Sequence, residues 1–305
     1  MVGVLICTYN GEKYITEQLE SLLSQLKQPD EVIIVDDCST DNTTNICKLF
    51  IDKHRLNNKW KVIINDTNQG WKSNFFKGVD YFKSEYIFFC DQDDIWDSHK
   101  ILDLYNLMLN NPTINVSACF ESLYIGDSIK KCKTNNYKKF YFSSDMPIKM
   151  LFHNFSGSCM CIKKEFYMKI KQYWNNQWAH DNFFWWIAYA SDSICILNKS
   201  LVLHRITGEN ASRNHMSRND RINYCQNILK NIKVIENILS KYSGAEINKK
   251  IFNFAKIKKG IILRQKFLSS MFLSPFYGII LLIKYRFVYL KIRTFFGDCK
   301  SILLS

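Results

Sequence analysis

Residues 86–96 read YIFFCDQDDIW, and this stretch decides the fold. Five apolar or aromatic residues, typical of a buried strand, lead directly into Asp91, Asp93 and Asp94, with Gln92 between the first two. Three carboxylates at the exit of a buried strand repel one another, and a divalent cation with a diphosphate behind it relieves that repulsion. Oxygen ligands suit Mg²⁺ or Mn²⁺ better than zinc, and ligands of open α/β sheets gather outside the carboxyl ends of strands. The stretch therefore predicts a sheet edge that binds a phosphorylated ligand.

The first hundred residues alternate short apolar runs with segments of helical periodicity. Strands are expected at 2–8, 32–35, 62–65 and 86–90, and helices at about 15–26, 43–54 and 73–82. Such alternation predicts a parallel sheet with right-handed crossover helices, a Rossmann-like α/β fold. No Gly-x-Gly-x-x-Gly pattern follows the first run, which argues against nicotinamide or flavin binding.

Composition and charge set broad limits on the class of protein. The 305 residues are 47% hydrophobic and 15% aromatic, enough for one large α/β domain plus an appendage. The net charge of +13 favours an anionic partner, such as lipid headgroups, phosphate or nucleic acid, without choosing among them.

The 11 cysteines are scattered through apolar segments and include no Cys-x-x-Cys pair. We interpret them as reduced core thiols of a cytosolic protein. No signal peptide is expected, because the first apolar run is short, lacks a basic leader and is followed at once by the turn Asn10-Gly11.

Polar residues follow the first two expected strands. Thr8, Tyr9 and Asn10 offer a hydroxyl, a ring that can stack on a base and an amide that tolerates a tight turn. Asp36 and Asp37 require partners, because adjacent carboxylates at the end of a buried strand are otherwise destabilising. For the following residues, Ser39 to Asp41, capping of the next helix is the better interpretation.

These motifs, in this order, resemble those of the family 2 glycosyltransferases of the GT-A fold, especially a bacterial polysaccharide rhamnosyltransferase-like branch. The resemblance covers residues 2 to about 210. It rests on Cys7-Thr8-Tyr9-Asn10, Val35-Asp36-Asp37-Cys38-Ser39-Thr40-Asp41, Asn68-Gln69-Gly70 with Asn74 and Gly78, Cys90-Asp91-Gln92-Asp93-Asp94-Ile95-Trp96, Ser156-Gly157-Ser158, and Ala179-His180-Asp181-Asn182-Phe183-Phe184-Trp185.

The resemblance implies roles for individual residues. On the donor side, it places Thr8, Tyr9, Asn10, Asp37, Asn68, Asn74, Asp91, Asp93 and Arg205 around a nucleotide-diphosphate sugar. The metal, Mn²⁺ or Mg²⁺, would be bound by Asp93, with Asp91 on the metal or the ribose. Asp181 matches the general base, and Gly157, Ser158, His180 and Trp185 would lie on the acceptor side.

Two of these assignments have structural alternatives. Asp181 could simply lie in the first turn of a helix at 182–190, where the helix dipole favours a carboxylate in any protein. Trp185 could be core rather than pocket wall.

Related sequences often carry a metal-binding His where this chain has Thr207, so either His204 substitutes for it or the metal has one protein ligand fewer.

The sequence changes character near residue 214. We predict a glycosyltransferase domain over residues 1–213 and a basic, apolar helical region over residues 214–305. Residues 267–283 carry no formal charge, but Ser, Pro and Gly interrupt them, and 17 residues is the lower limit for a membrane span. The flanking Lys284, Arg286, Lys291 and Arg293 fit contact with anionic lipid, and packing of amphipathic helices on the domain is the equal alternative.

The expected function is metal-dependent, inverting transfer of a sugar, rhamnose or a hexose, from a deoxythymidine- or uridine-diphosphate donor. The expected acceptor is a glycan on a polyprenyl diphosphate, in capsule or O-antigen assembly at the cytoplasmic face of the plasma membrane.

One alternative is a nucleotidyltransferase that forms nucleotide sugars, but Thr8–Lys13 lacks a basic, glycine-rich triphosphate loop. The other is a non-catalytic membrane- or nucleic-acid-binding protein; the acidic cluster argues against nucleic acid, because it repels phosphate backbones.

Overall fold

The computed structural model describes residues 1–125, 128–130, 139–146, 152, 155–207, 217–240, 245–270, 274–289 and 292–303. They form two compact units. The sheet unit comprises Met1–Ser144, Phe155–Ala188 and Asp192–Glu209, and the helical unit comprises Asp145–Asn154, Tyr189–Ser191 and Asn210–Ser305. The domain boundary expected at residues 213 and 214 lies outside the described residues.

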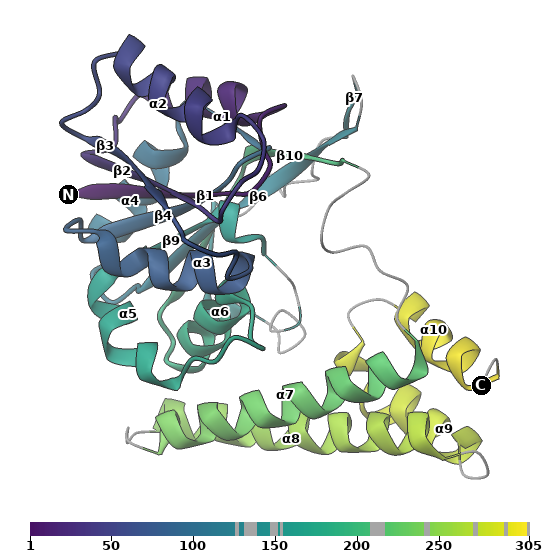
Figure 1. Cartoon of the computed structure of the whole chain (residues 1–305). Coiled ribbons are helices and arrows are strands. Elements are labelled where there is room, and N and C mark those ends of the chain that lie inside the picture. Colours follow the sequence, from purple (N-terminus) through teal and green to yellow (C-terminus); the bar gives the residue numbers. More distant parts are fainter. Residues whose placement is uncertain are drawn as a thin grey trace. The chain divides into compact units, whose positions relative to one another are not determined.

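The alternation expected over the first hundred residues is confirmed (Figure 1). The elements are β1 (Val2–Thr8), α1 (Ile15–Leu23), β2 (Glu31–Asp36), α2 (Thr43–Lys53), β3 (Trp60–Ile64), α3 (Trp71–Gly78) and β4 (Tyr86–Asp91). β1 pairs in parallel with β2 and β4, and β2 pairs in parallel with β3. The carboxyl ends of these four strands therefore lie along one edge of the sheet.

The second half of the sheet, beyond the residues for which a parallel sheet was expected, is mixed. Its elements are β5 (Ile95–Trp96), α4 (Lys100–Leu109), β6 (Val116–Ile125), β7 (Ser128–Lys130), β8 (Phe140–Phe142), β9 (Met160–Lys163), α5 (Lys164–Ile170), α6 (His180–Ala190) and β10 (Ile194–Arg205). The strand order is β3-β2-β1-β4-β9-β6-β10-β5. β9 runs antiparallel to both of its neighbours, β4 and β6. It is entered from a short 3₁₀ turn at Gly157–Cys159 rather than from a crossover helix.

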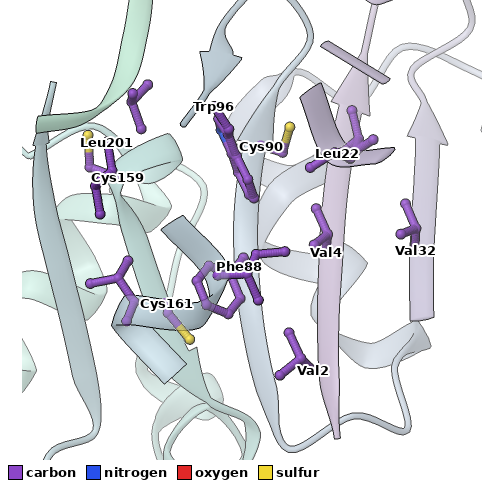
Figure 2. Packing of buried hydrophobic residues seen from close by; sticks show 14 of the residues in the cluster. Val2, Val4, Leu22, Val32, Phe88, Cys90, Trp96, Cys159, Cys161 and Leu201 are labelled. Carbon is purple, nitrogen blue, oxygen red and sulfur yellow. The ribbon is translucent and has the colours of Figure 1, made fainter. Parts of the chain in front are cut away.

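Alternate side chains of the central strands face opposite layers of helices. Val4, Phe88 and Cys90 belong to a core that includes the apolar faces of α1, α2 and α4, and Figure 2 shows Val4, Phe88 and Cys90 side by side in this core. On the other face, Phe89 lies 6.1 Å from Phe75 of α3, between ring centroids. Both faces are buried, so these strands read as continuous apolar runs rather than alternating ones.

The helical unit contains α7 (Arg218–Leu239), α8 (Ala245–Ser269), α9 (Ser274–Lys284) and α10 (Ile292–Leu303), as expected for the C-terminal region. Its centre holds a buried cluster of charges around Asp298, which is fully buried. Asp298 accepts hydrogen bonds from Arg221 of α7 at 2.8 Å, from Arg264 of α8 at 2.7 Å and from the Tyr289 hydroxyl at 3.0 Å. One carboxylate thus ties three helices together.

Over the part of the chain that the structure describes, no helix is both long enough and apolar enough to cross a membrane. The uncharged stretch at 267–283 is divided between the end of α8 and α9. Of the basic residues expected to flank it, Lys291 lies outside the described residues, as does the side chain of Arg293.

Candidate active site

The parallel pairing of β1, β2 and β4 gathers the polar residues expected at their ends. Thr8 lies opposite Asp36, and Cys7 lies opposite both Val35 and Asp91. The Asp37 backbone N–H donates to the Thr8 carbonyl at 2.8 Å. The sites predicted after three separate strands are therefore one site in space.

The two adjacent carboxylates after β2 have protein partners. Asp36 accepts hydrogen bonds from the Thr8 hydroxyl at 2.8 Å and from the Ser39 hydroxyl at 2.6 Å. Asp37 accepts from the backbone N–H groups of Gln69 at 2.8 Å and Gly70 at 2.9 Å. Asp37 thus fixes the loop before α3, and contact with a nucleobase stays a prediction for it.

The capping expected after β2 is present in part. Asp41 accepts from the Thr43 N–H at 3.0 Å in the first turn of α2, and the pKa of Asp41 is lowered by its hydrogen bonds to Thr43 despite partial burial. Ser39 and Thr40 instead bond to Asn10: Ser39 accepts from the Asn10 N–H at 2.9 Å, and the Thr40 N–H donates to the Asn10 side chain at 2.9 Å. Asn10 has a positive φ of 49°, as a tight turn requires.

Tyr9 is 47% exposed at the same edge, so its ring is free to receive a flat group. Its backbone is fixed by Gln92, the residue between Asp91 and Asp93, which accepts from the Tyr9 N–H at 2.9 Å and donates to the Tyr9 carbonyl at 3.1 Å. A Cβ on Gly11 would lie 2.2 Å from the Gln92 amide oxygen, so a larger residue there would displace the Gln92 side chain from Tyr9. The sequence pattern gave no sign of this link between β1 and the acidic cluster.

The two asparagines expected near the donor have different environments. Asn68 accepts from the Gly70 N–H at 3.0 Å on an exposed loop. Asn74 is buried, donates to the Val35 carbonyl at 3.0 Å and accepts from Asn65 at 3.0 Å. Asn74 therefore fastens α3 to β2, and its contact with a donor stays a prediction.

The carboxylates after β4 form an acidic cluster of Asp91, Asp93 and Asp94. Burial raises the pKa of Asp93 to about 6, and the charge of Asp94 adds to the effect. Burial also raises the pKa of Asp91 well above its usual range, and the charges of Asp94, Asp93 and Asp181 raise it further. These groups repel one another, as the sequence predicted.

His204 lies against this cluster. Its Nδ1 is 3.0 Å from the Asp94 carboxylate, and this hydrogen bond is the main reason that the pKa of His204 is raised to about 9. The Asp94 oxygen Oδ2 is buried without a hydrogen-bond partner among the described residues. Both alternatives left by Thr207 therefore stay predictions, because His204 is paired with Asp94 rather than presenting a free nitrogen.

Arg205 also lies beside the acidic cluster. It donates to the Asp93 carbonyl at 3.0 Å and to the Glu17 carboxylate at 2.6 Å, and its guanidinium stacks between Tyr14 and Tyr124. The sequence predicts that Arg205 contacts a diphosphate. In that case the diphosphate would replace the partly exposed Glu17 as the partner of Arg205.

The residues present suit Mg²⁺ or Mn²⁺ bound together with a ligand phosphate. Within the described residues, no three His, Cys, Asp or Glu side chains are arranged to hold an ion by themselves. Mg²⁺ is commonly bound by one or two carboxylates plus phosphate oxygens, and Asp91 and Asp93 with the unpartnered Asp94 oxygen supply such a set.

Asp181 lies in the first turn of α6, one residue after its start. Burial raises its pKa to about 6, and the Asn182 N–H, 2.6 Å from its carboxylate, limits the rise. Asp181 is linked to the acidic cluster through the 156–158 loop: the Ser156 hydroxyl donates to Asp91 at 3.4 Å, and Gly157 lies against His180, the residue before Asp181. A carboxylate with a pKa near neutrality beside an acidic cluster is suited to general base chemistry.

His180 precedes Asp181 but is not bonded to it. Its ring is buried, stacks 4.4 Å from Phe75, and has no hydrogen-bond partner among the described residues on either nitrogen. Burial lowers its pKa to about 3, so the ring is neutral. A Cβ on Gly157 would lie 2.4 Å from His180 Nε2, so the two residues expected on the acceptor side do touch.

The loop Ser156-Gly157-Ser158 connects this region to the acidic cluster. The Ser156 hydroxyl donates to Asp91 at 3.4 Å and lies 3.1 Å from the Ser158 hydroxyl. The fully buried Lys100 donates a hydrogen bond to the Ser158 carbonyl. Lys100 was missed by the sequence analysis, although a lysine on the apolar face of the helix that follows the acidic cluster was the available signal.

Trp185 is buried on α6. It is 1% exposed and stacks on Phe155, with ring centroids 4.6 Å apart. Of the two alternatives left by the sequence, this burial favours packing in the core, and contact with an acceptor stays a prediction.

Comparison with known proteins identifies the family. The family model "Glycosyl transferase family 2" matches residues 3–171, which contain β1 to β4, the acidic cluster and the 156–158 loop. The chain belongs to glycosyl transferase family 2. The motif at 179–185, which includes Asp181, and Arg205 lie beyond the matched residues.

Curated relatives and solved structures agree with this family. The chain is 32% identical to a dTDP-rhamnosyl transferase of Shigella flexneri over 183 residues, which cover 55% of this chain and 57% of that protein. It is 35% identical to the glycosyltransferase GlyG of Streptococcus pneumoniae over 34% of each chain. The chain thus spans about half or less of the length of these relatives.

The solved structures show the fold. TarS of Staphylococcus aureus (residues 1–349) in complex with UDP-GlcNAc has a TM-score of 0.65 at 20% identity, covering 99% of this chain and 88% of that one. A mannosyltransferase of Pyrobaculum calidifontis in complex with GDP-Man and Mn²⁺ has a TM-score of 0.57 at 14% identity, covering 99% and 86%. The expected GT-A fold with a C-terminal helical region is confirmed.

Proposed function

We propose that this family 2 glycosyltransferase transfers a sugar, with inversion, from a nucleotide-diphosphate donor to a hydroxyl of a glycan. The observation that carries the proposal is the proximity of Asp181 to the acidic cluster. The Ser156 hydroxyl donates to Asp91 at 3.4 Å, and the next residue, Gly157, lies against His180, which directly precedes Asp181. Burial raises the pKa of Asp181 to about 6, which suits a general base.

Three sets of residues would serve such a reaction. Asp181 would accept the proton of the acceptor hydroxyl as its oxygen attacks the anomeric carbon, opposite the departing nucleotide diphosphate. Tyr9, exposed beside Gln92, would stack on the base, and Thr8 and Asn10 would line the same end of β1. Asp93, with Asp91, would hold Mn²⁺ or Mg²⁺, and the bound cation would supply neutralising charge for the diphosphate.

The donor and acceptor are proposals drawn from the relatives. The Shigella flexneri relative, a dTDP-rhamnosyl transferase, supports deoxythymidine-diphosphate rhamnose, whereas TarS, solved with UDP-GlcNAc, supports a uridine-diphosphate hexose. We propose a polyprenyl-diphosphate-linked glycan as the acceptor, in cell-surface polysaccharide assembly at the cytoplasmic face of the membrane. We also propose that the transferase domain covers residues 1–213.

A donor panel with and without acceptor tests the proposal. We expect release of nucleotide diphosphate with one donor, and Asp181→Asn should retain donor binding while turnover falls about 10²–10⁴-fold, since a general base contributes about that factor. Asp80→Asn, which removes an exposed carboxylate paired with Lys171, is the matched control and should turn over normally. Unchanged turnover in Asp181→Asn would exclude Asp181 as the base.

The two alternative functions predict different results. A nucleotidyltransferase would release pyrophosphate from a nucleoside triphosphate and a sugar phosphate. A nucleic-acid-binding protein would show a thermal shift with RNA alone, whereas the transferase should shift with uridine or deoxythymidine diphosphate only when Mn²⁺ is present.

A further inference from the structure

The excess of positive over negative charge is confined to one part of the chain. Residues 1–213 contain 24 Lys and Arg against 24 Asp and Glu, whereas residues 214–305 contain 17 against 4. The whole net charge of +13 therefore comes from the last 92 residues. The excess of cations therefore belongs to the sequence that forms α7 to α10.

The same region contains a helix with an apolar face that no described residue covers. Phe276, Ile279, Ile280 and Ile283 of α9 are spaced to lie on one face of the helix. Phe276 and Ile279 are each 59% exposed and Ile283 is 79% exposed. Large apolar side chains exposed together on one helix are uncommon on a soluble surface and mark an interaction site.

The opposite face of α9 is the one that packs. Leu281 is fully buried, and a Cβ on Gly278 would lie 3.1 Å from the ring of Phe267 in α8. The helix is thus already anchored to its own unit through Gly278 and Leu281. The exposed face is not needed for folding of this unit.

Basic side chains gather where the apolar face ends. Lys284 closes α9, and Arg286 follows it; both are exposed. Lys256 of α8 also reaches this end, since its Nζ lies 5.4 Å from the ring centroid of Phe287. An apolar face bordered by cations matches a membrane interface, where apolar side chains enter the acyl boundary and cations contact anionic headgroups.

We propose that α9 is a membrane-docking helix. Its face of Phe276, Ile279, Ile280 and Ile283 inserts into the interface of an anionic bilayer, and Lys284, Arg286 and Lys256 bind the lipid headgroups. With 11 residues, α9 is too short to span the bilayer and lies in the interface. Membrane docking by α9 is separate from the transfer reaction, and vesicle binding can be measured without it.

Flotation of the full chain with vesicles tests this proposal. We expect binding at low salt to phosphatidylcholine vesicles containing phosphatidylglycerol and little binding to phosphatidylcholine alone. Ile279→Glu/Ile283→Glu should weaken binding at least about tenfold, because it removes two inserted apolar side chains. The matched control is Leu49→Glu, which changes an equally exposed (59%) leucine on α2 and should bind as the unchanged protein does.

A second variant tests the electrostatic part. Lys284→Gln/Arg286→Gln should bind about thirtyfold more weakly at low salt, since each cation near an anionic surface contributes about fivefold. The difference should shrink at high salt, where screening removes the contribution in both proteins. Circular dichroism would verify that all variants keep the same helix content.

Three outcomes would overturn the proposal. The first is no flotation of the unchanged protein with anionic vesicles. The second is equal flotation of Ile279→Glu/Ile283→Glu. The third is self-association without lipid that Ile279→Glu/Ile283→Glu abolishes, together with absence of vesicle binding, which would assign the face to a second copy of the chain.

Discussion

At the scale of single residues, the contact between Gly157 and His180 fixes how closely the 156–158 loop approaches α6. The His180 ring is neutral, stacks on Phe75 and fills the space that a side chain at position 157 would occupy. The loop that bonds to Asp91 through Ser156 can therefore approach α6 only if position 157 is glycine. The pair has a positioning role, because neither residue contacts the acidic cluster directly in the described structure.

We expect Gly157→Ala to lower the free energy of unfolding by about 1–3 kcal/mol, because overpacking a filled site forces neighbouring groups to move. Chemical denaturation would measure the change. His180→Ala opens the space, so the double variant Gly157→Ala/His180→Ala should be more stable than the sum of the two single changes predicts. Additive changes would show that the two residues do not compete for the same space.

The pH dependence of turnover follows from the pKa of Asp181. Burial raises that pKa to about 6, and only the ionised carboxylate accepts a proton. Turnover at saturating donor should therefore fall about tenfold per pH unit below pH 6 and level off above about pH 7. A rate independent of pH between 5 and 7 would contradict the assignment.

Asp93 also has a pKa of about 6, and its titration must be separated from that of Asp181. Protons compete with a metal ion for Asp93, so a limb of the pH profile due to Asp93 should move to lower pH as Mn²⁺ is raised. A limb due to Asp181 should stay in place. The profile measured at several Mn²⁺ concentrations therefore distinguishes the two carboxylates.

At the scale of elements, the charge cluster around Asp298 holds α7, α8 and α10 together. Asp298→Asn leaves Arg264 and Arg221 buried beside a neutral partner, and we expect a loss of about 3–5 kcal/mol in the stability of the helical unit. The control is Glu236→Gln, which breaks the partly exposed pair with Lys258 and should change stability by about 1 kcal/mol or less.

Two optical probes would locate this effect. All 7 tryptophans lie between Trp60 and Trp186, within the sheet unit, whereas circular dichroism also reports the helices of the helical unit. Asp298→Asn should therefore shift the unfolding transition seen by circular dichroism. Equal unfolding midpoints for Asp298→Asn and Glu236→Gln would contradict a stabilising role for the cluster.

The elements also show how far the sequence determines the structure. The strands β1 to β4 could be predicted because strands buried on both faces are continuous apolar runs, and the carboxylates after β4 stand out directly behind one. The antiparallel direction of β9 could not be predicted, because Met160–Lys163 is short and nothing local in it encodes the direction of pairing. Local pattern identifies an element, and its partners are decided by residues distant in the sequence.

The candidate site shows the same division. Asp91 and Asp93 could be selected from the residues themselves, since they stand directly behind an apolar run, whereas Asp181, in the first turn of a helix, was selected through the family resemblance. The bond between Gln92 and Tyr9 and the bond between Lys100 and Ser158 join residues 83 and 58 positions apart, which no periodicity reveals. The sequence left Trp185 open between core and pocket wall, because an aromatic ring in either position has the same sequence signature.

At the scale of the whole molecule, net charge and chemistry are separated along the chain. The residues proposed for transfer lie in a part with no net charge, and the excess of cations lies in the part that carries α9. Attraction to an anionic surface is therefore independent of the titration of Asp181 and Asp93, so surface binding should persist over the pH range in which turnover changes.

The buried cysteines have a consequence for how opening of this protein can be followed. Of the ten described cysteines, all of them free, eight are buried, and burial raises the pKa of thiols such as Cys7 and Cys90. Alkylating reagents attack the thiolate, so a buried thiol reacts only while the structure around it is transiently exposed to solvent. Seven of these thiols lie in the sheet unit and Cys225 lies in α7. Peptide masses after timed alkylation therefore report the opening rate of each unit separately, through the native cysteines.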